Sequence, residues 1–323
     1  MTTVEVVSSG AISRRARIGP GDEMIVDPGG EADSPTVSGT NGSLPPLVFV
    51  VLRVGGIARN ALVEDGAEAI VGNGGVMYGT TLGSAGEAVL PEMLVMNKGE
   101  ASGTRLISGY LEVHNGGHTI GTVISGGEEL VAKGGSTTGT TILSGTVQGL
   151  AGVALRTVVS SGGNQAVDSG RTVSTTISQG GTEVLGDARS IATRILSGGM
   201  EVASSGAVTS ESLISSSGEE IVSSGGIADA TQIYKGGTLT VSSGGAVSGG
   251  LVFHAGSAVI DGAVEAGTIR FAGVAGLLDL NDVADFHAAI SGFKGATEKI
   301  DIAASASSKA RPSAGSSWAR AAR

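Results

Sequence analysis

The sequence predicts an all-β fold, a parallel β-solenoid of 18 to 19 residue coils with a non-repeating C-terminal cap. Three observations predict it: glycines recur at 18 or 19 residue spacings, β-branched residues keep fixed distances from them, and no window has helical periodicity. These structural turn glycines are Gly109, Gly127, Gly145, Gly163, Gly181, Gly199, Gly218, Gly237 and Gly256.

Each repeat predicts two or three short strands joined at glycine corners, where we expect a positive φ. β-branched residues that we expect to face inward stand four positions before a turn glycine, at Val123, Val159, Ile177, Ile195, Ile214, Ile233 and Val252. A second inward set stands four positions after it, at Val113, Val131, Val167, Leu185, Val222, Val241 and Ile260, with exceptions at Gly149 and Ala203.

The repeat divides the chain into four segments. We expect degenerate coils with insertions over residues 1–99, regular coils over 100–262, a capping segment over 263–303, and a disordered basic tail over 304–323. The insertion Ser43–Arg53 interrupts the repeat most clearly. An alternative interpretation makes residues 40–60 a separate edge strand that covers the solenoid end.

Composition limits the function. A net charge of −10 argues against nucleic acid as a partner, and the basic residues were expected to gather near the chain ends, at Arg14, Arg15, Arg17, Lys309, Arg311, Arg320 and Arg323. The absence of cysteine excludes disulfides and thiolate chemistry. The longest apolar run, Leu47–Leu52, is too short for a transmembrane segment, and no Sec signal is visible.

Several repeat units resemble one known family. The units Thr122–Thr138, Thr175–Ala192 and Thr231–Ser248 resemble the strand-loop-strand repeat of autotransporter passengers, as in AIDA-like and antigen-43-like adhesins. The resemblance implies a right-handed parallel β-helix at the outer cell surface or outside the cell. It also implies adhesion or self-aggregation, with partners that are further copies of the chain or cell-surface glycans and receptors.

The chain departs from this family's pattern after residue 262. Nothing there has the length or aromatic content expected of a translocator β-barrel. The segment Phe286–Ile302 resembles one that follows these repeats in members without a barrel. These observations leave the secretion route open and allow that the chain is a truncated passenger fragment that acts as a spacer.

We expect no catalytic, cofactor or metal site. Acidic residues recur just after the turn glycine, and we interpret them as an outward, solvated ladder rather than a catalytic pair: Glu128, Glu129, Glu183, Glu201, Glu219 and Glu220. The histidines, His114, His118, His254 and His287, lack helical zinc spacing. The stretch Asp279–Asp282 offers oxygen ligands without the glycine and closing glutamate of a calcium loop.

The serine-rich turns allow two interpretations. Serine hydroxyls commonly satisfy turn backbone groups. The family resemblance alternatively implies O-glycosylation at Ser160, Ser161, Ser204, Ser205, Ser223, Ser224, Ser242 and Ser243. Together these observations predict a non-enzymatic adhesin-like repeat protein, with a polysaccharide-processing β-helix enzyme as the alternative from another class.

Overall fold

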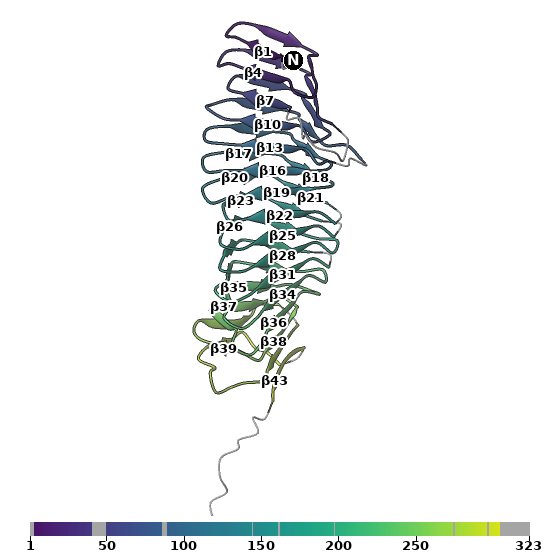
Figure 1. Cartoon of the computed structure of the whole chain (residues 1–323). Coiled ribbons are helices and arrows are strands. Elements are labelled where there is room, and N and C mark those ends of the chain that lie inside the picture. Colours follow the sequence, from purple (N-terminus) through teal and green to yellow (C-terminus); the bar gives the residue numbers. More distant parts are fainter. Residues whose placement is uncertain are drawn as a thin grey trace, which may run out of the picture.

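The protein is a rod of stacked coils, shown as a computed structural model in Figure 1. The structure describes residues 3–40, 50–85, 89–143, 145–160, 162–196, 198–273, 275–295 and 297–303. All regular elements in these ranges are β-strands, and every strand pair is parallel. The tail 304–323 lies outside the described residues, as do residues 41–49 of the insertion.

Each coil contributes one strand to sheet A, which has 16 strands in the described part of the chain. At about 4.8 Å per step, these strands give a stack roughly 70 Å long. The strands of sheet A, in spatial order, are β1 (Val4–Val7), β4 (Glu23–Val26), β7 (Val51–Val54), β10 (Glu68–Val71), β13 (Glu92–Val95), β16 (Tyr110–Val113), β19 (Glu128–Val131), β22 (Val147–Leu150), β25 (Asn164–Val167), β28 (Thr182–Leu185), β31 (Met200–Ala203), β34 (Glu219–Val222), β36 (Thr238–Val241), β38 (Ser257–Ile260), β41 (Gly276–Leu280) and β43 (Glu298–Ile302).

The other strands form sheet B, which consists of two rows, B1 and B2. Row B1 contains β2 (Ile12–Arg14), β5 (Glu31–Asp33), β8 (Ile57–Arg59), β11 (Val76–Tyr78), β14 (Glu100–Ser102), β17 (His118–Ile120), β20 (Ser136–Thr138), β23 (Val153–Leu155), β26 (Arg171–Val173), β29 (Arg189–Ile191), β32 (Val208–Ser210) and β39 (Ala263–Val264). Row B2 contains β3 (Arg17–Ile18), β6 (Thr36–Ser38), β9 (Leu62–Glu64), β12 (Thr81–Leu82), β15 (Arg105–Leu106), β18 (Val123–Ile124), β21 (Thr141–Ile142), β24 (Val158–Val159), β27 (Thr176–Ile177), β30 (Arg194–Ile195), β33 (Leu213–Ile214), β40 (Thr268–Phe271) and β42 (Ala289–Ser291). The long strands β35 (Ile227–Ile233) and β37 (Ala246–Phe253) run through both rows.

The N-terminal insertion does not interrupt the stack. Strand β7 pairs in register with β4 on one side and β10 on the other, so it forms an ordinary coil. The interpretation of residues 40–60 as an edge strand over the solenoid end is therefore wrong for the described residues from Val50 onward. Strands β40 to β43 also continue the two sheets. The capping role of 263–303 and the right-handed winding stay predictions.

The corner glycines have two different roles. Gly109, Gly127 and Gly145 have positive φ values of 89°, 76° and 68°. The expectation of a positive φ is wrong at the other six turn glycines, where steric contact explains the residue. A Cβ atom on Gly218, for example, would lie 2.4 Å from the carbonyl oxygen of Ile195 in the preceding coil. Glycine is therefore required there because the coils approach closely.

The inward positions are mostly as expected, with one slip in the repeat. Val123 and Val252 point outward, and their neighbours Ile124 and Phe253 are fully buried instead. The cause is the length of the corner that leads from row B2 to the next strand of sheet A. This corner has three residues after Ile124 but four after Val159, so the turn glycine stands one position closer to the inward residue Ile124. The exception at Gly149 has another cause: Gly145 stands two positions before the next strand instead of one, so Leu150 occupies that inward position.

Candidate functional surface

Four of the six acidic residues expected on the surface lie inside the solenoid. Glu129, Glu183, Glu201 and Glu220 have no exposed surface, whereas Glu128 and Glu219 are half-exposed on the outer face of sheet A. The prediction of a solvated ladder is wrong for these four. Sheet A strands begin with an outward residue, so the alternation of a β-strand turns the second residue inward.

These glutamates belong to a polar column inside the rod. Successive sheet A strands place a polar residue at the same inward position, and strand register stacks them one coil apart: Glu129, Gln148, Gln165, Glu183, Glu201 and Glu220. Buried threonine and serine side chains from sheet B surround the column, including Thr119, Thr137, Thr140, Thr157, Thr172, Thr175, Ser190, Thr193, Thr209, Ser212 and Thr231. We call this stretch, from Glu129 to Glu220 with its hydroxyl partners, the polar core.

Hydroxyl groups from sheet B donate hydrogen bonds to the buried carboxyls. Ser190 Oγ and Ser212 Oγ donate to the two oxygens of Glu201, at 2.7 and 3.1 Å. Thr209 and Thr231 donate to the two oxygens of Glu220 in the same way. Each carboxyl thus has one partner from either side of the corner between rows B1 and B2.

Burial makes these carboxyls hold their protons. Loss of hydration raises the pKa of Glu129 and Glu201, and it raises the pKa of Glu220 to about 8. The pKa of Glu183 lies well above its ordinary value, because burial is reinforced by the charge of Glu201. The carboxyls of Glu183 and Glu201 also share a hydrogen bond, which requires a proton on one of them.

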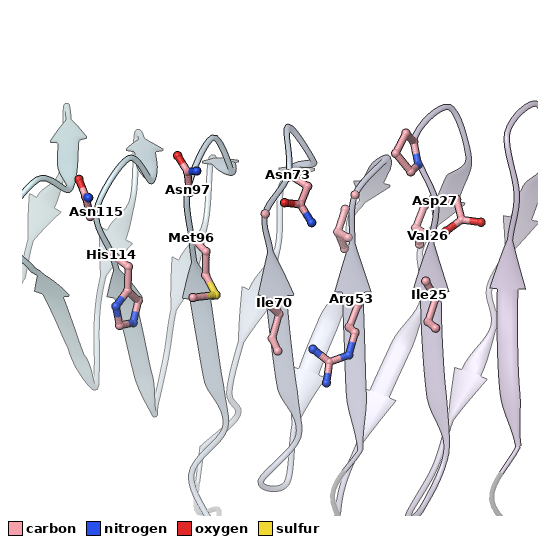
Figure 2. Close-up of a pocket in the computed structure, with 14 residues that line it drawn as sticks. Ile25, Val26, Asp27, Arg53, Ile70, Asn73, Met96, Asn97, His114 and Asn115 are labelled. Carbon is pink, nitrogen blue, oxygen red and sulfur yellow. The ribbon is translucent and has the colours of Figure 1, made fainter.

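A groove lies on the outer face of sheet A near the N-terminus. It has a volume of about 650 Å³ and crosses the coils from β4 to β16 (Figure 2). Ile25, Ile70 and Met96 supply apolar side chains, and a row of turn asparagines forms one edge: Asn73, Asn97 and Asn115. Asp27 and His114 lie at opposite ends of the groove, so they do not form an acid and base pair.

The histidines and the Asp279–Asp282 stretch make local contacts. His114 Nε2 lies 3.0 Å from Glu112 Oε2, and the His254 ring stacks on Tyr234 at 4.2 Å between centroids. The Asp282 carboxylate accepts a bond from the backbone N–H of Ala284. Within the described ranges, no three His, Asp or Glu side chains are grouped so that they could hold a metal ion. The same ranges contain no helix long and apolar enough to cross a membrane.

The serine turns separate into two corners. Ser205, Ser224 and Ser243 are exposed at equivalent positions of three consecutive coils, each after a sheet A strand and beside a half-exposed serine: Ser204, Ser223 and Ser242. Ser160 lies in a different corner, between β24 and β25, and Ser161 is outside the described residues. Six of the eight serines therefore form one ladder along the rod.

Comparison with solved structures finds several similar chains. A crystal structure titled as the TibC-catalyzed hyper-glycosylated TibA55-350 fragment is 29% identical, with a TM-score of 0.72, and the match covers 81% of this chain and 92% of the fragment. The match bears out the resemblance to autotransporter passenger repeats and the β-solenoid fold. A siphovirus 9NA tailspike receptor binding domain also matches, at 12% identity and a TM-score of 0.18, too low to support an argument. No family model and no curated protein matches the chain.

The likeness to this fragment points to the outer surface of the coils. The matched fragment is described as hyper-glycosylated, with TibC as the catalyst. For a passenger repeat protein the relevant site is a surface repeated along the rod rather than one cleft. Sequence reasoning found the serine turns of this surface but missed the groove and the buried carboxyls.

Proposed function

We propose that the protein mediates self-aggregation or adhesion to cell-surface glycans and receptors, without enzymatic activity, through many weak contacts along the rod. The observation that carries this proposal is the coil register, which repeats each outward position about every 4.8 Å over 16 strands of sheet A. Two rods lying side by side can repeat the same contact at each coil. The strength of association then comes from copy number.

Deletion of whole coils tests this proposal. Removing Tyr110–Thr146 or Glu219–Gly256 takes out two complete coils and preserves the register of the remaining strands. We expect both deletions to weaken aggregation of cells that display the protein partially and to similar extents. Complete loss in one folded deletion, with no effect in the other, would contradict a distributed surface and locate the function in two coils.

We further propose that the serine ladder carries O-linked sugar. Exposed hydroxyls in consecutive coils give a transferase a repeated acceptor, and the matched fragment is described as hyper-glycosylated. Intact-mass analysis of protein from its native host tests this, with added hexose or heptose masses as the expected result. The matched control replaces Ser205, Ser224 and Ser243 by alanine, and it should remove sugar without changing the circular dichroism spectrum.

A further inference from the structure

The folded protein has a basic face that the formal charge of the sequence segment does not reveal. Between Val147 and Ala203 the chain has four arginines and four acidic residues, so this segment is formally neutral. Glu183 and Glu201 are inside the polar core, whereas the arginines are all exposed: Arg156, Arg171, Arg189 and Arg194. Only Asp168 and Asp187 remain as exposed carboxylates in this segment. The expectation that basic residues gather only near the chain ends is thus incomplete.

The four arginines occupy neighbouring coils of sheet B. Arg171 on β26 and Arg189 on β29 are register partners, one coil apart. Arg156 stands at the corner before β24, and Arg194 begins β30 in the same coil as β29. Two like charges on adjacent strands repel one another, so their arrangement is unfavourable unless an anion lies between or above them.

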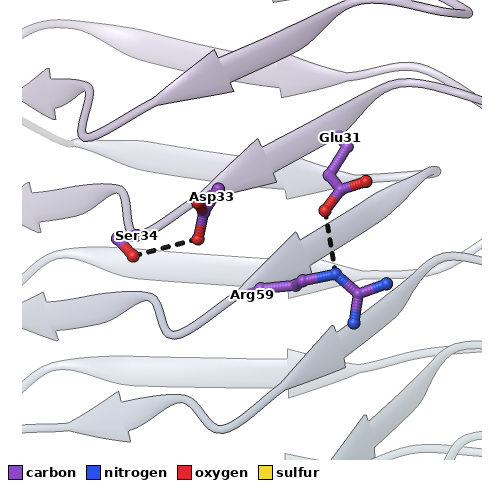
Figure 3. A network of polar contacts seen from close by, with 4 residues as sticks. All are labelled: Glu31, Asp33, Ser34 and Arg59. Carbon is purple, nitrogen blue, oxygen red and sulfur yellow. Dashed lines mark hydrogen bonds and ion pairs between the residues drawn. The ribbon is translucent and has the colours of Figure 1, made fainter.

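Two arginines nearer the N-terminus, Arg53 and Arg59, are arranged differently. Arg53 Nε donates to Glu23 at 2.6 Å. Arg59 Nε donates to Glu31 at 2.8 Å, as Figure 3 shows. Arg59 also lies over the Tyr78 ring. By contrast, none of the four central arginines forms an ion pair within the described part of the chain. Their guanidinium groups keep all their donors available to a ligand.

We propose that the face formed by Arg156, Arg171, Arg189 and Arg194 binds a linear polysaccharide that carries carboxylate groups. Guanidinium groups recognise carboxylates through paired, charge-assisted hydrogen bonds. A polymer that runs along the rod can present successive carboxylates to arginines on successive coils. The chain has a net charge of −10, which disfavours polyanions over most of the remaining surface, apart from the exposed arginines of the first coils, Arg14, Arg15 and Arg17.

The composition of the face favours a polysaccharide over nucleic acid. Single-stranded nucleic acid binds through phosphate contacts combined with aromatic side chains on which the bases stack. The segment from Val147 to Ala203 contains no Phe, Tyr or Trp. The groups that the face offers are charged donors, surrounded by the hydroxyls of Thr176 and Ser174.

The inference rests on the proposed function, because it names one ligand class for the adhesive surface. The test measures binding of the full chain to immobilised polygalacturonate, to its neutral methyl ester and to single-stranded DNA. We expect polygalacturonate to bind, with an affinity that falls as salt is raised, and the other two polymers to bind at least tenfold more weakly. Failure of polygalacturonate to bind, or equal binding of the methyl ester or of DNA, would overturn the inference.

Two double variants test whether the central arginines form the polysaccharide-binding site. R171Q with R189Q removes the register pair, and R53Q with R59Q removes the same charge from the paired arginines. We expect the first to weaken binding roughly a hundredfold, about tenfold for each charged contact, and the second less than about threefold. Equal losses of affinity in the two double variants would contradict the assignment of the binding site to the central arginines.

Cell aggregation separates this inference from the proposed function. Cells that display R171Q with R189Q should still aggregate, because the other coils keep their surfaces. Loss of polygalacturonate binding with normal aggregation supports both proposals. Aggregation of the unaltered protein without any binding overturns only the polysaccharide site.

Discussion

The coils before Val113 and the coils from Glu129 to Glu220 have the same backbone but different interiors. In the first region the inward position of sheet A holds Met24, Leu52, Ala69, Met93 and Leu111, all fully buried. In the second, the same position holds glutamate or glutamine throughout. The difference teaches that the solenoid backbone does not require an apolar filling, provided that the neighbouring columns supply hydrogen bonds.

The two interiors stabilise the rod by different means. A buried leucine or methionine contributes about 2 kcal/mol through loss of hydration. A net hydrogen bond contributes about 1 kcal/mol, and a buried polar group without a partner costs more than that. The buried carboxyls of the second region therefore depend on hydroxyls in rows B1 and B2, such as Thr209 and Thr231 around Glu220. The first region has no such dependence.

The largest expected effect comes from placing a carboxyl in the apolar interior. Leu52 is fully buried between its register partners Met24 and Ala69, and the buried residues Ala58 and Ala61 follow it in the same coil; none of the four can donate a side-chain hydrogen bond. We expect Leu52→Glu to lower the free energy of unfolding by about 5 kcal/mol at neutral pH, measured by denaturant titration. Leu52→Met is the control and should cost less than about 1.5 kcal/mol. A folded Leu52→Glu protein of nearly normal stability would contradict the comparison.

The second prediction concerns how the stability of the polar core depends on pH, a dependence that the apolar interior lacks. Glu220 faces the hydroxyls of Thr209 and Thr231, with the Glu201 carboxyl on one side and Leu239 on the other, and no cation. Its pKa is raised to about 8 in the folded protein from an ordinary value of 4.5. The folded state thus binds the proton more tightly than the unfolded state. The stability that it contributes is present below pH 4.5 and is lost as pH rises toward 8.

Glu220→Gln removes this titration. The loss amounts to on the order of 4 kcal/mol at most in the unaltered protein. We expect the melting temperature to fall between pH 5 and pH 8.5 in both proteins, and to fall less in the variant, because Glu129, Glu183 and Glu201 still titrate there. Gln148 and Gln165 occupy the same column, so glutamine fits the site. Glu219→Gln, on the outer face, is the control and should leave the pH dependence unchanged; identical pH profiles for both variants would refute the assignment.

The coil fold could be predicted because glycine spacing and β-branched positions report backbone geometry directly. The polar core was also visible in part. Val131, Leu185 and Val222 were expected to face inward, and strand alternation then turns Glu129, Glu183 and Glu220 inward as well. The general preference of carboxylates for water led to the opposite conclusion. Alternation outweighs that preference here, because threonine columns on the facing sheet satisfy the carboxyls.

Other features depend on relations between distant residues and were not predictable. The slip at Val123 results from a corner one residue shorter, which moves the glycine relative to the strand. The groove combines residues from Ile25 to Asn115 that become neighbours only when coils stack. The basic face likewise required knowledge of which acidic residues are buried. Each of these follows from strand register, which a single sequence does not specify.

The smallest expected effect tests what the two regions share. Gly99 in the first region and Gly226 in the second occupy the same corner, and an added Cβ would lie 2.3 Å and 2.6 Å from the carbonyl oxygens of Val71 and Ala203. Because these contacts involve only backbone, Gly99→Ala and Gly226→Ala should each cost about 2 kcal/mol regardless of the interior. Gly121→Ala is the control: its φ of 65° is strained for alanine, but nothing lies within 4 Å, so the cost should be about 1 kcal/mol. Unequal losses at Gly99 and Gly226 in thermal unfolding would mean that the interior also alters the coil backbone, and the comparison would then extend beyond side chains.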